Sequence, residues 1–335
     1  MSTNKNHILT DSFGRKHTYL RISLTEKCNL RCTYCMPQEG VPLTPSKHLM
    51  NAEELFQIAS LFVEEGVTKI RLTGGEPLVR KDFPELLQQL ATLPTRLSIT
   101  TNGVIIDRHT ALLKKCHVNT INLSLDTLDA EKFKKITFRN DFDKVYKNIF
   151  LLLRERFHVK INVVLMKGVN DDEILDFLRF TKEHPVSVRF IEFMPFEGNA
   201  WNRSKTVSYE HIMHLVEAHF GSDAVIRLQD APNDTTKNYK IQNFEGSFGI
   251  ISTVTNPFCD SCNRLRLTAN GQLKNCLFSD SESDLLAPFR AGKDIRPVIR
   301  KAVLKKHAMR GGLDRPETFD DVRQHKNRSM IRIGG

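Results

Sequence analysis

The stretch YLRISLTEKCNLRCTYC, residues 19–35, places an apolar, β-branched run directly before three closely spaced cysteines. We expect residues 19–25 to form a strand, with Cys28, Cys32 and Cys35 on the loop that follows it. Three thiolates on one loop can bind three irons of a cubic 4Fe-4S cluster and leave the fourth iron open to another ligand. The alternatives are a zinc site completed by a distant residue, which the spacing does not favour, and unrelated structural cysteines.

Similar apolar runs recur along the chain and alternate with amphipathic stretches. We expect strands at 19–25, 68–74, 97–102, 120–126, 159–166 and 186–194, and helices that include 51–66, 81–93 and 171–184. Six such βα units predict parallel strands with right-handed crossovers. The fold class is therefore α/β, an incomplete (βα)6 barrel of the TIM type, and the alternative is a doubly wound open sheet.

The domain organisation follows from where this alternation starts and stops. We expect an N-terminal tail at 1–14, the partial barrel at 15–230, and a C-terminal region at 231–335, where the sequence becomes irregular before a second group of cysteines. A chain of 335 residues is long enough for one large barrel or two domains.

The composition of the chain narrows the classes of protein to which it can belong. The N-terminus lacks the apolar centre of a secretory signal, and no apolar run is long enough to cross a membrane, so we expect a cytoplasmic protein whose seven cysteines are metal ligands or thiols. The formal charge of +10 is compatible with a polyanionic partner or with a solvated basic surface.

The second cysteine group lies in NPFCDSCNRLRLTANGQLKNC and has the spacing C-x2-C-x13-C. Cys259, Cys262 and Cys276 again lack an obvious fourth ligand. Cys116 could complete this group, but we expect it to be a buried helical thiol. Two incomplete triads indicate a second cluster with an open iron that binds a different molecule.

Cations interrupt the expected strands. Arg21, Lys69, Arg71, Lys160 and Arg189 lie inside apolar runs, and the two-residue step from Lys69 to Arg71 places both on one face. If that face lines the barrel interior it must hold an anion, because burying an uncompensated charge is costly. A nucleoside triphosphate fits, and Arg264 and Arg266 could add contacts. The alternative is that these side chains reach the outer surface between helices.

The first triad resembles the signature of the radical S-adenosylmethionine (SAM) superfamily, C-x3-C-x-aromatic-C, with Tyr34 at the aromatic position. TGGEP at 73–77 is similar to the GGEP motif of that superfamily. The resemblance implies that SAM binds the open iron and is cleaved to a 5′-deoxyadenosyl radical. Paired glycines would let the backbone approach the ligand, and the carboxylate of Glu76 could receive the ammonium of SAM.

The second triad and the basic NRLRL that follows it resemble the GTP 3′,8-cyclase family of molybdenum cofactor biosynthesis, and the resemblance runs from the first strand to the final IGG. It implies one cluster on Cys28, Cys32 and Cys35 and a second 4Fe-4S cluster on Cys259, Cys262 and Cys276, whose open iron takes the guanine end of GTP. The residues implied for SAM are Tyr34, Thr73, Gly75, Ser124, Asn162 and Met194. The residues implied for GTP are Arg21, Lys69, Arg71, Thr100, Lys160, Arg189, Arg264 and Arg266. Thr100 and Ser124 could instead bond their own backbone.

The reaction implied is a radical cyclisation, in which hydrogen leaves ribose C3′ and the carbon radical adds to guanine C8. The resemblance also implies an electron donor such as flavodoxin or ferredoxin, cyclic pyranopterin monophosphate synthase as the enzyme that takes the product, no nucleic acid or membrane partner, and room for a homodimer. A radical SAM peptide maturase and a zinc-dependent nucleic-acid-binding protein are the alternative functions.

The chain ends in MIRIGG. Terminal glycines are usually frayed, yet Ile331 and Ile333 alternate with Arg332 as in a strand that could anchor the tail. The resemblance implies that Gly334 and Gly335 reach the active site and are needed for the radical step. In contrast, we expect Lys305 and Lys306 to be exposed and without a role in binding.

Overall fold

The computed structural model describes residues 7–36, 40–321, 325 and 327–334. Two compact units are present. The first consists of the described residues of Met1–Cys28, Pro42–Ser98 and Cys259–Gly335, and the second of those of Asn29–Val41 and Ile99–Phe258. The predicted boundary near residue 230 stays a prediction.

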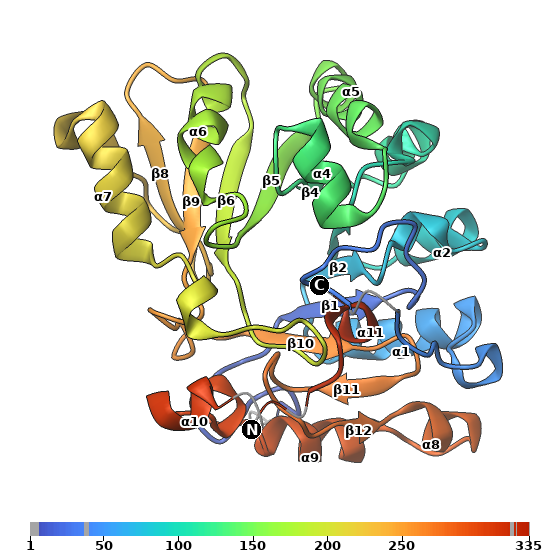
Figure 1. Cartoon of the computed structure of the whole chain (residues 1–335). Coiled ribbons are helices and arrows are strands. Elements are labelled where there is room, and N and C mark those ends of the chain that lie inside the picture. Colours follow the sequence, from blue (N-terminus) through green and yellow to red (C-terminus); the bar gives the residue numbers. More distant parts are fainter. Residues whose placement is uncertain (1–6, 37–39, 322–324, 326, 335) are drawn as a thin grey trace, which may run out of the picture. The chain divides into compact units, whose positions relative to one another are not determined.

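The first unit contains a sheet with the strand order β12-β11-β10-β1-β2. β10 (Arg264–Leu267) and β2 (Lys69–Thr73) flank β1 (Tyr19–Ser23), and both pair with it in parallel. β11 (Gln272–Lys274) and β12 (Ser283–Asp284) continue the sheet in antiparallel fashion. Figure 1 shows β1, β10 and β11 side by side, and α9 (Arg296–Leu304) of the C-terminal segment contacts β11 and β12.

Helices of the first unit begin and end at recognisable signals. In α1 (Ala52–Glu64), Asn51 accepts a hydrogen bond from the backbone of Glu54 while the Glu54 side chain accepts one from the backbone of Asn51, which is a complete capping box. The helix buries Leu55, Ile58, Ala59 and Phe62, and it contacts α2 (Phe83–Leu90). The remaining helices are α8 (Leu286–Arg290), α9 (Arg296–Leu304), α10 (Pro316–Asp320) and α11 (Met330–Ile333).

The second unit contains a sheet with the order β3-β4-β5-β6-β9-β8-β7. β3 (Arg96–Thr101), β4 (Thr120–Ser124), β5 (His158–Leu165), β6 (Ser187–Glu192) and β9 (Ser247–Ile251) run in parallel. β8 (Lys237–Ile241) and β7 (Val225–Arg227) are antiparallel at the edge. The helices are α3 (Thr110–Lys115), α4 (Ala130–Thr137), α5 (Phe142–Arg154), α6 (Ile174–Glu183) and α7 (Tyr209–Phe220).

The predicted strands and the three predicted helices are confirmed within two or three residues at each end, and so is the parallel α/β fold class. In both units the side chains along each strand point alternately to two different faces of the sheet. One face is apolar, as Ile70, Leu72, Ile121 and Ile161 illustrate with no exposed surface. The other face carries the polar and cationic side chains that the sequence singled out. β9 and β10 were not predicted from the sequence, and they extend the parallel arrangement with strands from the C-terminal part of the chain.

Candidate active site

The loop after β1 carries the first cysteine triad. Cys28 is the last residue of its segment in the first unit, whereas Cys32 and Cys35 belong to the second unit, where the Cys35 amide donates to the Cys32 carbonyl at 3.0 Å. All three side chains are partly exposed. Within the described part of the chain, no three His, Cys, Asp or Glu side chains gather closely enough for a single metal ion. A cubic cluster needs wider spacing because each thiolate binds a different iron, so the loop fits such a cluster.

Tyr34 lies between two of these cysteines and is linked to Asp126, just beyond β4. Burial, reinforced by the negative charge of Asp126, raises the pKa of the Tyr34 phenol well above its usual value. Burial also raises the pKa of Asp126 to about 6, although the amide of Val164 donates to its carboxylate at 2.8 Å. The Tyr34 carbonyl in turn accepts from the Asn199 amide group at 3.3 Å, and the same group donates to the Met194 carbonyl at 2.8 Å. The aromatic position of the signature is therefore held rigidly in place.

The TGGEP turn follows β2 and is packed against the loop after β1. The amide of Gly75 donates to the carbonyl of Thr25 at 2.7 Å. A Cβ atom at Gly74 would lie 2.6 Å from the Thr25 oxygen, and one at Gly75 would lie 2.4 Å from the Lys27 oxygen. The glycines are therefore required by this approach of two backbones, whereas the sequence had suggested the approach of a ligand as the reason.

Two side chains of this turn have defined partners. The hydroxyl of Thr73 donates to the carbonyl of Ile22 at 3.2 Å. Glu76 has no exposed surface, and its Oε1 accepts from the amide of Leu78 at 3.1 Å. An ammonium contact of Glu76 stays a prediction.

One face of the first unit's sheet carries five cations, which we call the cationic ladder: Arg21, Lys69, Arg71, Arg264 and Arg266. The strand registers place them in two rows. Tyr19 pairs with both Lys69 and Arg264, and two residues further along Arg21 pairs with both Arg71 and Arg266. Residues opposite one another in parallel strands point to the same side, so both rows share one face.

Tyr19 completes the first row of the ladder and was not predicted from the sequence. Lys69 Nζ, Arg71 Cζ and Arg21 Cζ lie 4.7, 5.5 and 6.0 Å from the centre of its ring. Burial alone would raise the pKa of its phenol, but these three cations outweigh burial and lower that pKa to about 7. The sequence YLRIS contains a signal for this role, because Tyr19 and Arg21 are two residues apart and therefore point to the same face of the strand. The face therefore has a strongly positive potential.

Arg266 is the most enclosed member of the ladder, with 7% of its surface exposed. Burial lowers its pKa well below the usual value, and Arg21 and Arg264 add to this by repulsion. Its Nη1 donates a hydrogen bond to the carbonyl of Gly334. The C-terminal tail thus reaches the ladder.

The tail is a short helix, α11, and the strand predicted from Ile331 and Ile333 is wrong. Both isoleucines are buried in this helix. Gly334 follows with φ of 78°, and a Cβ atom there would lie 2.6 Å from Thr73 Oγ1 and 3.0 Å from Ser23 Cβ. Only glycine fits at this position, next to the ends of β1 and β2. Gly335 lies outside the described residues.

The second unit has a polar face of its own. Register places Thr100, Asn122, Lys160 and Ser187 in one row, and Ser124, Asn162 and Arg189 in the next row on the same side. Arg189 Nη1 donates to Asn122 Oδ1 at 3.2 Å. Among described residues, Thr100 Oγ1 and Asn162 Oδ1 are buried without a hydrogen-bond partner, so Thr100 does not bond its own backbone. Buried polar atoms of this kind indicate a polar ligand.

The second cysteine triad lies at the start of the last segment of the first unit. The amide of Cys262 donates to the Cys259 carbonyl at 3.0 Å, and the pKa of Cys259 is raised by burial and by the nearby Cys276 and Cys262. Burial would also raise the pKa of Cys262, but Arg264 and Lys306 outweigh it and lower that pKa to about 7. Iron binds the thiolate, and the surroundings of Cys262 favour that form. Three neighbouring thiols fit a second cluster.

Two other predictions concern Cys116 and the lysine pair at 305 and 306. Cys116 is buried at the C-terminal end of α3, and burial raises its pKa, as expected of a structural thiol. Lys305 is exposed, but the expectation that Lys306 is exposed is wrong, since only 4% of its surface is accessible.

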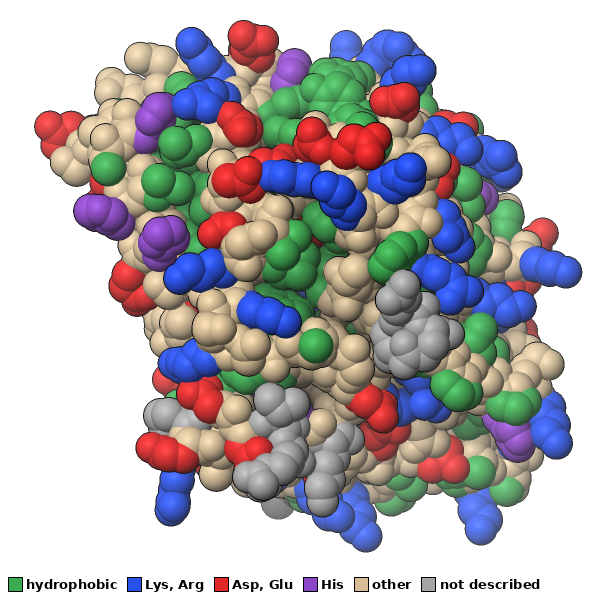
Figure 2. All heavy atoms as spheres, viewed as in Figure 1, with side chains coloured by type: hydrophobic (Ala, Val, Ile, Leu, Met, Phe, Trp, Pro, Cys, Tyr) green, Lys and Arg blue, Asp and Glu red, His purple; other side chains and the backbone are tan. Residues whose placement is uncertain are grey.

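The charged surface and the length of the helices are relevant to the expectation that the chain has no nucleic acid or membrane partner. Figure 2 shows lysine and arginine side chains spread among acidic ones on the face in view, without a single basic patch there. Over the described residues, no helix is both long and apolar enough to cross a membrane.

Comparison with known proteins places the chain in a family. The Radical SAM superfamily domain matches residues 22–181, and the Molybdenum Cofactor Synthesis C domain matches 186–310. GTP 3′,8-cyclase, mitochondrial, of Arabidopsis thaliana is 48% identical over 98% of this chain and 84% of its own length. GTP 3′,8-cyclase of Desulforamulus reducens is 41% identical over 91% of this chain and 96% of its own length. The chain spans only 51% of the human Molybdenum cofactor biosynthesis protein 1, at 45% identity.

Solved structures agree on the fold. Streptococcus suis SuiB bound to S-adenosylmethionine has a TM-score of 0.60 at 18% identity, covering 84% of this chain and 65% of SuiB. At this identity the likeness concerns the fold alone, whereas the domain matches and the relatives extend over nearly the whole sequence. The chain belongs to the radical SAM superfamily and, within it, to the GTP 3′,8-cyclase family of molybdenum cofactor biosynthesis.

Proposed function

We propose that this chain converts GTP to (8S)-3′,8-cyclo-7,8-dihydroguanosine 5′-triphosphate, the first step of molybdenum cofactor biosynthesis, using two 4Fe-4S clusters. Membership of the family implies SAM and one cluster. The proposal adds the substrate, the second cluster and the residues that hold them. The observation that carries it is the cationic ladder, which lies in the same unit as the second triad.

The cations of the ladder would bind the triphosphate of GTP. Arg21, Arg71 and Arg266 form one row, and arginine donates paired hydrogen bonds to phosphate oxygens. Lys69 and Arg264 form the adjacent row with Tyr19. A polyanion on this face would offset the repulsion that already lowers the pKa of Arg266. We assign the triphosphate to this face.

The guanine end would lie toward the second triad. Arg264 is two residues from Cys262 and contributes both to the ladder and to the low pKa of that thiol. A GTP molecule whose phosphates lie on the ladder could therefore present guanine to an open iron held by Cys259, Cys262 and Cys276. The polar row of the second unit, Thr100, Lys160 and Arg189, would add contacts to the substrate, as predicted from the sequence.

The first triad would hold the cluster that binds SAM. When bound, SAM and this cluster would supply the radical chemistry. With one electron from the donor, the hydrogen of ribose C3′ would leave as part of 5′-deoxyadenosine, C3′ would bond to guanine C8, and a further electron and a proton would complete the dihydro product. Tyr34 lies against Asp126, Thr73 bonds to Ile22 in β1, and Gly75 bonds to Thr25 in the loop after β1. We propose that these residues, with Ser124, Asn162 and Met194, line the SAM pocket. The task of the protein is placement, because a misplaced radical would attack the wall of the site.

Further partners belong to the same proposal. A one-electron donor such as flavodoxin or ferredoxin would start the reaction, and cyclic pyranopterin monophosphate synthase would take the product. We propose a cytoplasmic enzyme, without nucleic acid or membrane partners, that could act as a homodimer. The word mitochondrial belongs to the plant relative.

The test is binding and turnover with anaerobically reconstituted protein. GTP should bind to the protein and, with SAM and a reductant, yield the cyclised nucleotide together with 5′-deoxyadenosine. A radical SAM peptide maturase would share both cysteine groups but would not bind GTP. Zinc in place of iron and sulfide would instead favour a nucleic-acid-binding protein.

A further inference from the structure

Lys306 is a buried lysine next to the second triad. It follows α9, and its side chain is enclosed while that of its neighbour Lys305 is exposed. Its Nζ donates to the carbonyl of Arg264 at 3.1 Å and to the carbonyl of Asn275, and its positive charge helps to lower the pKa of the Cys262 thiol. An ammonium has three N–H donors, and these two carbonyls accept from two of them.

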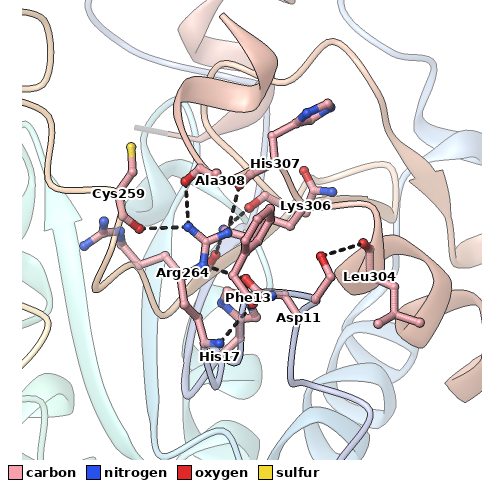
Figure 3. Close-up of polar contacts among 12 residues, drawn as sticks. Asp11, Phe13, His17, Cys259, Arg264, Leu304, Lys306, His307 and Ala308 are labelled. Atoms are coloured by element: carbon pink, nitrogen blue, oxygen red, sulfur yellow. Dashed lines mark hydrogen bonds and ion pairs between the residues drawn. The ribbon is translucent and has the colours of Figure 1, made fainter. Parts of the chain in front are cut away.

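The two carbonyls belong to the two segments that carry the triad. Arg264 is two residues after Cys262, and Asn275 directly precedes Cys276. Lys306 therefore ties the segment of Cys262 to the segment of Cys276. Figure 3 shows Lys306 together with Cys259 and Arg264. Enclosing an ammonium is costly unless negative charge offsets it, and thiolates bound to a cluster would supply that charge.

Arg15 supports the same region in a different way. Its guanidinium donates to the carbonyls of Cys259, His307 and Ala308 at 2.9, 2.8 and 2.7 Å, and Asp11 holds it at 2.7 Å. Figure 3 shows Asp11, Cys259, His307 and Ala308 gathered around these contacts. Arg15 thus contacts only oxygen atoms in these bonds, whereas the charge of Lys306 also acts on the Cys262 thiol. Variants of the two residues can therefore distinguish an effect on the position of the triad from an effect of charge on the Cys262 sulfur.

We propose that Lys306 is a positioning residue for the second cluster, which holds the Cys262 and Cys276 segments together through their carbonyls and raises the reduction potential of the cluster through its positive charge beside them. This inference rests on the proposed function, because the second cluster is part of it. Hydrogen bonds to the sulfurs and net charge both tune the potentials of such clusters. A nearby fixed positive charge stabilises the more negative, reduced form, and its removal lowers the potential.

The experiment is redox titration of the second cluster, followed by electron paramagnetic resonance, in full-length protein reconstituted anaerobically. Lys306→Met removes charge and donors, Lys306→Gln keeps donors without charge, and Lys305→Met is the matched control. Both changes at Lys306 should lower the potential, and the control should leave it unchanged. Arg15→Gln should reduce the iron retained at the second triad, with a smaller shift of the potential of the remaining clusters.

The outcomes separate the two proposals. If wild-type protein holds only about four irons and no second signal, the proposed second cluster fails. If wild type holds both clusters and the Lys306 variants keep the wild-type potential, the role of Lys306 is wrong and the second cluster stands. Loss of iron from the second triad alone, with SAM cleavage retained, would support the positioning role. Global unfolding of both variants would instead show that Lys306 serves the fold, and would overturn the proposal.

Discussion

The guanidinium of Arg266 donates a hydrogen bond to the carbonyl of Gly334, next to the last residue of the chain. Arg266 belongs to the cationic ladder, in the same row as Arg21 and Arg71. The tail is therefore linked to the surface that we assign to the triphosphate. This contact suggests that the tail senses or positions the substrate.

Replacing Gly334 with Ala should abolish most cyclised product while leaving iron content and uncoupled SAM cleavage nearly intact. A Cβ atom there would lie 2.6 Å from Thr73 Oγ1, so the tail must shift. Gly292→Ala is a matched control, because Gly292 has a similar φ of 69° and, among the described residues, nothing within 4 Å of an added Cβ. Each change should cost about 1 kcal/mol of stability from the backbone alone.

Product yields measure the effect on turnover, and thermal unfolding measures the effect on stability. Normal turnover of the Gly334 variant would show that the tail is dispensable. Deletion of Gly334 and Gly335 should have the same effect on product.

Arg71→Ala should weaken GTP binding by about 1.5–3 kcal/mol, roughly 10- to 150-fold, and weaken SAM binding much less. Arg71 is 8% exposed, so a lost charge-assisted contact is poorly replaced by water. Equilibrium titration of each ligand measures the effect, with exposed Lys305→Ala as the control. Lys306 cannot serve as that control because it is buried. Equal losses in the Arg71 and Lys305 variants would place the ladder outside the substrate site.

Replacement of Cys28, Cys32 and Cys35 by Ala should halve the iron from about eight to about four per chain and abolish SAM cleavage. Replacement of Cys259, Cys262 and Cys276 should remove the same amount of iron, but SAM cleavage should continue while GTP cyclisation stops. Iron and sulfide analysis, together with 5′-deoxyadenosine release, distinguishes the triads. Retained SAM cleavage in the first variant would contradict the assignment of the first triad.

Tyr19 should make GTP binding weaken as pH rises through about 7. Its pKa is lowered to about 7 by Arg71, Arg21 and Lys69 against the effect of burial, so a phenolate forms above that pH and cancels part of the ladder's charge. Bound phosphate would raise this pKa again, and binding should take up a proton. Calorimetry in buffers of different ionisation enthalpy counts that proton. Tyr19→Phe should bind GTP with a flatter pH profile from about pH 6 to 9, and an unchanged profile would contradict the role of Tyr19.

Local sequence patterns are enough to predict the order of the elements and the chemistry of the site. The strands are readable because β-branched runs alternate with amphipathic helices, and period-two spacing by itself places Lys69 and Arg71 on one face. Both triads are evident from cysteine spacing, which a chain folded onto a cluster must preserve. These features depend on neighbours in sequence.

Contacts between distant segments decide the rest. The ladder exists because β10 pairs with β1, which brings Arg264 level with Tyr19 and Arg266 level with Arg21 across about 245 residues. Lys306 looks like an ordinary surface lysine in VLKKHAMR, and only the folded C-terminal segment encloses it beside Cys262. The tail alternates like a strand, yet it is a helix that buries both isoleucines. Strand register and burial depend on which segments meet, and a local pattern carries no information on that choice.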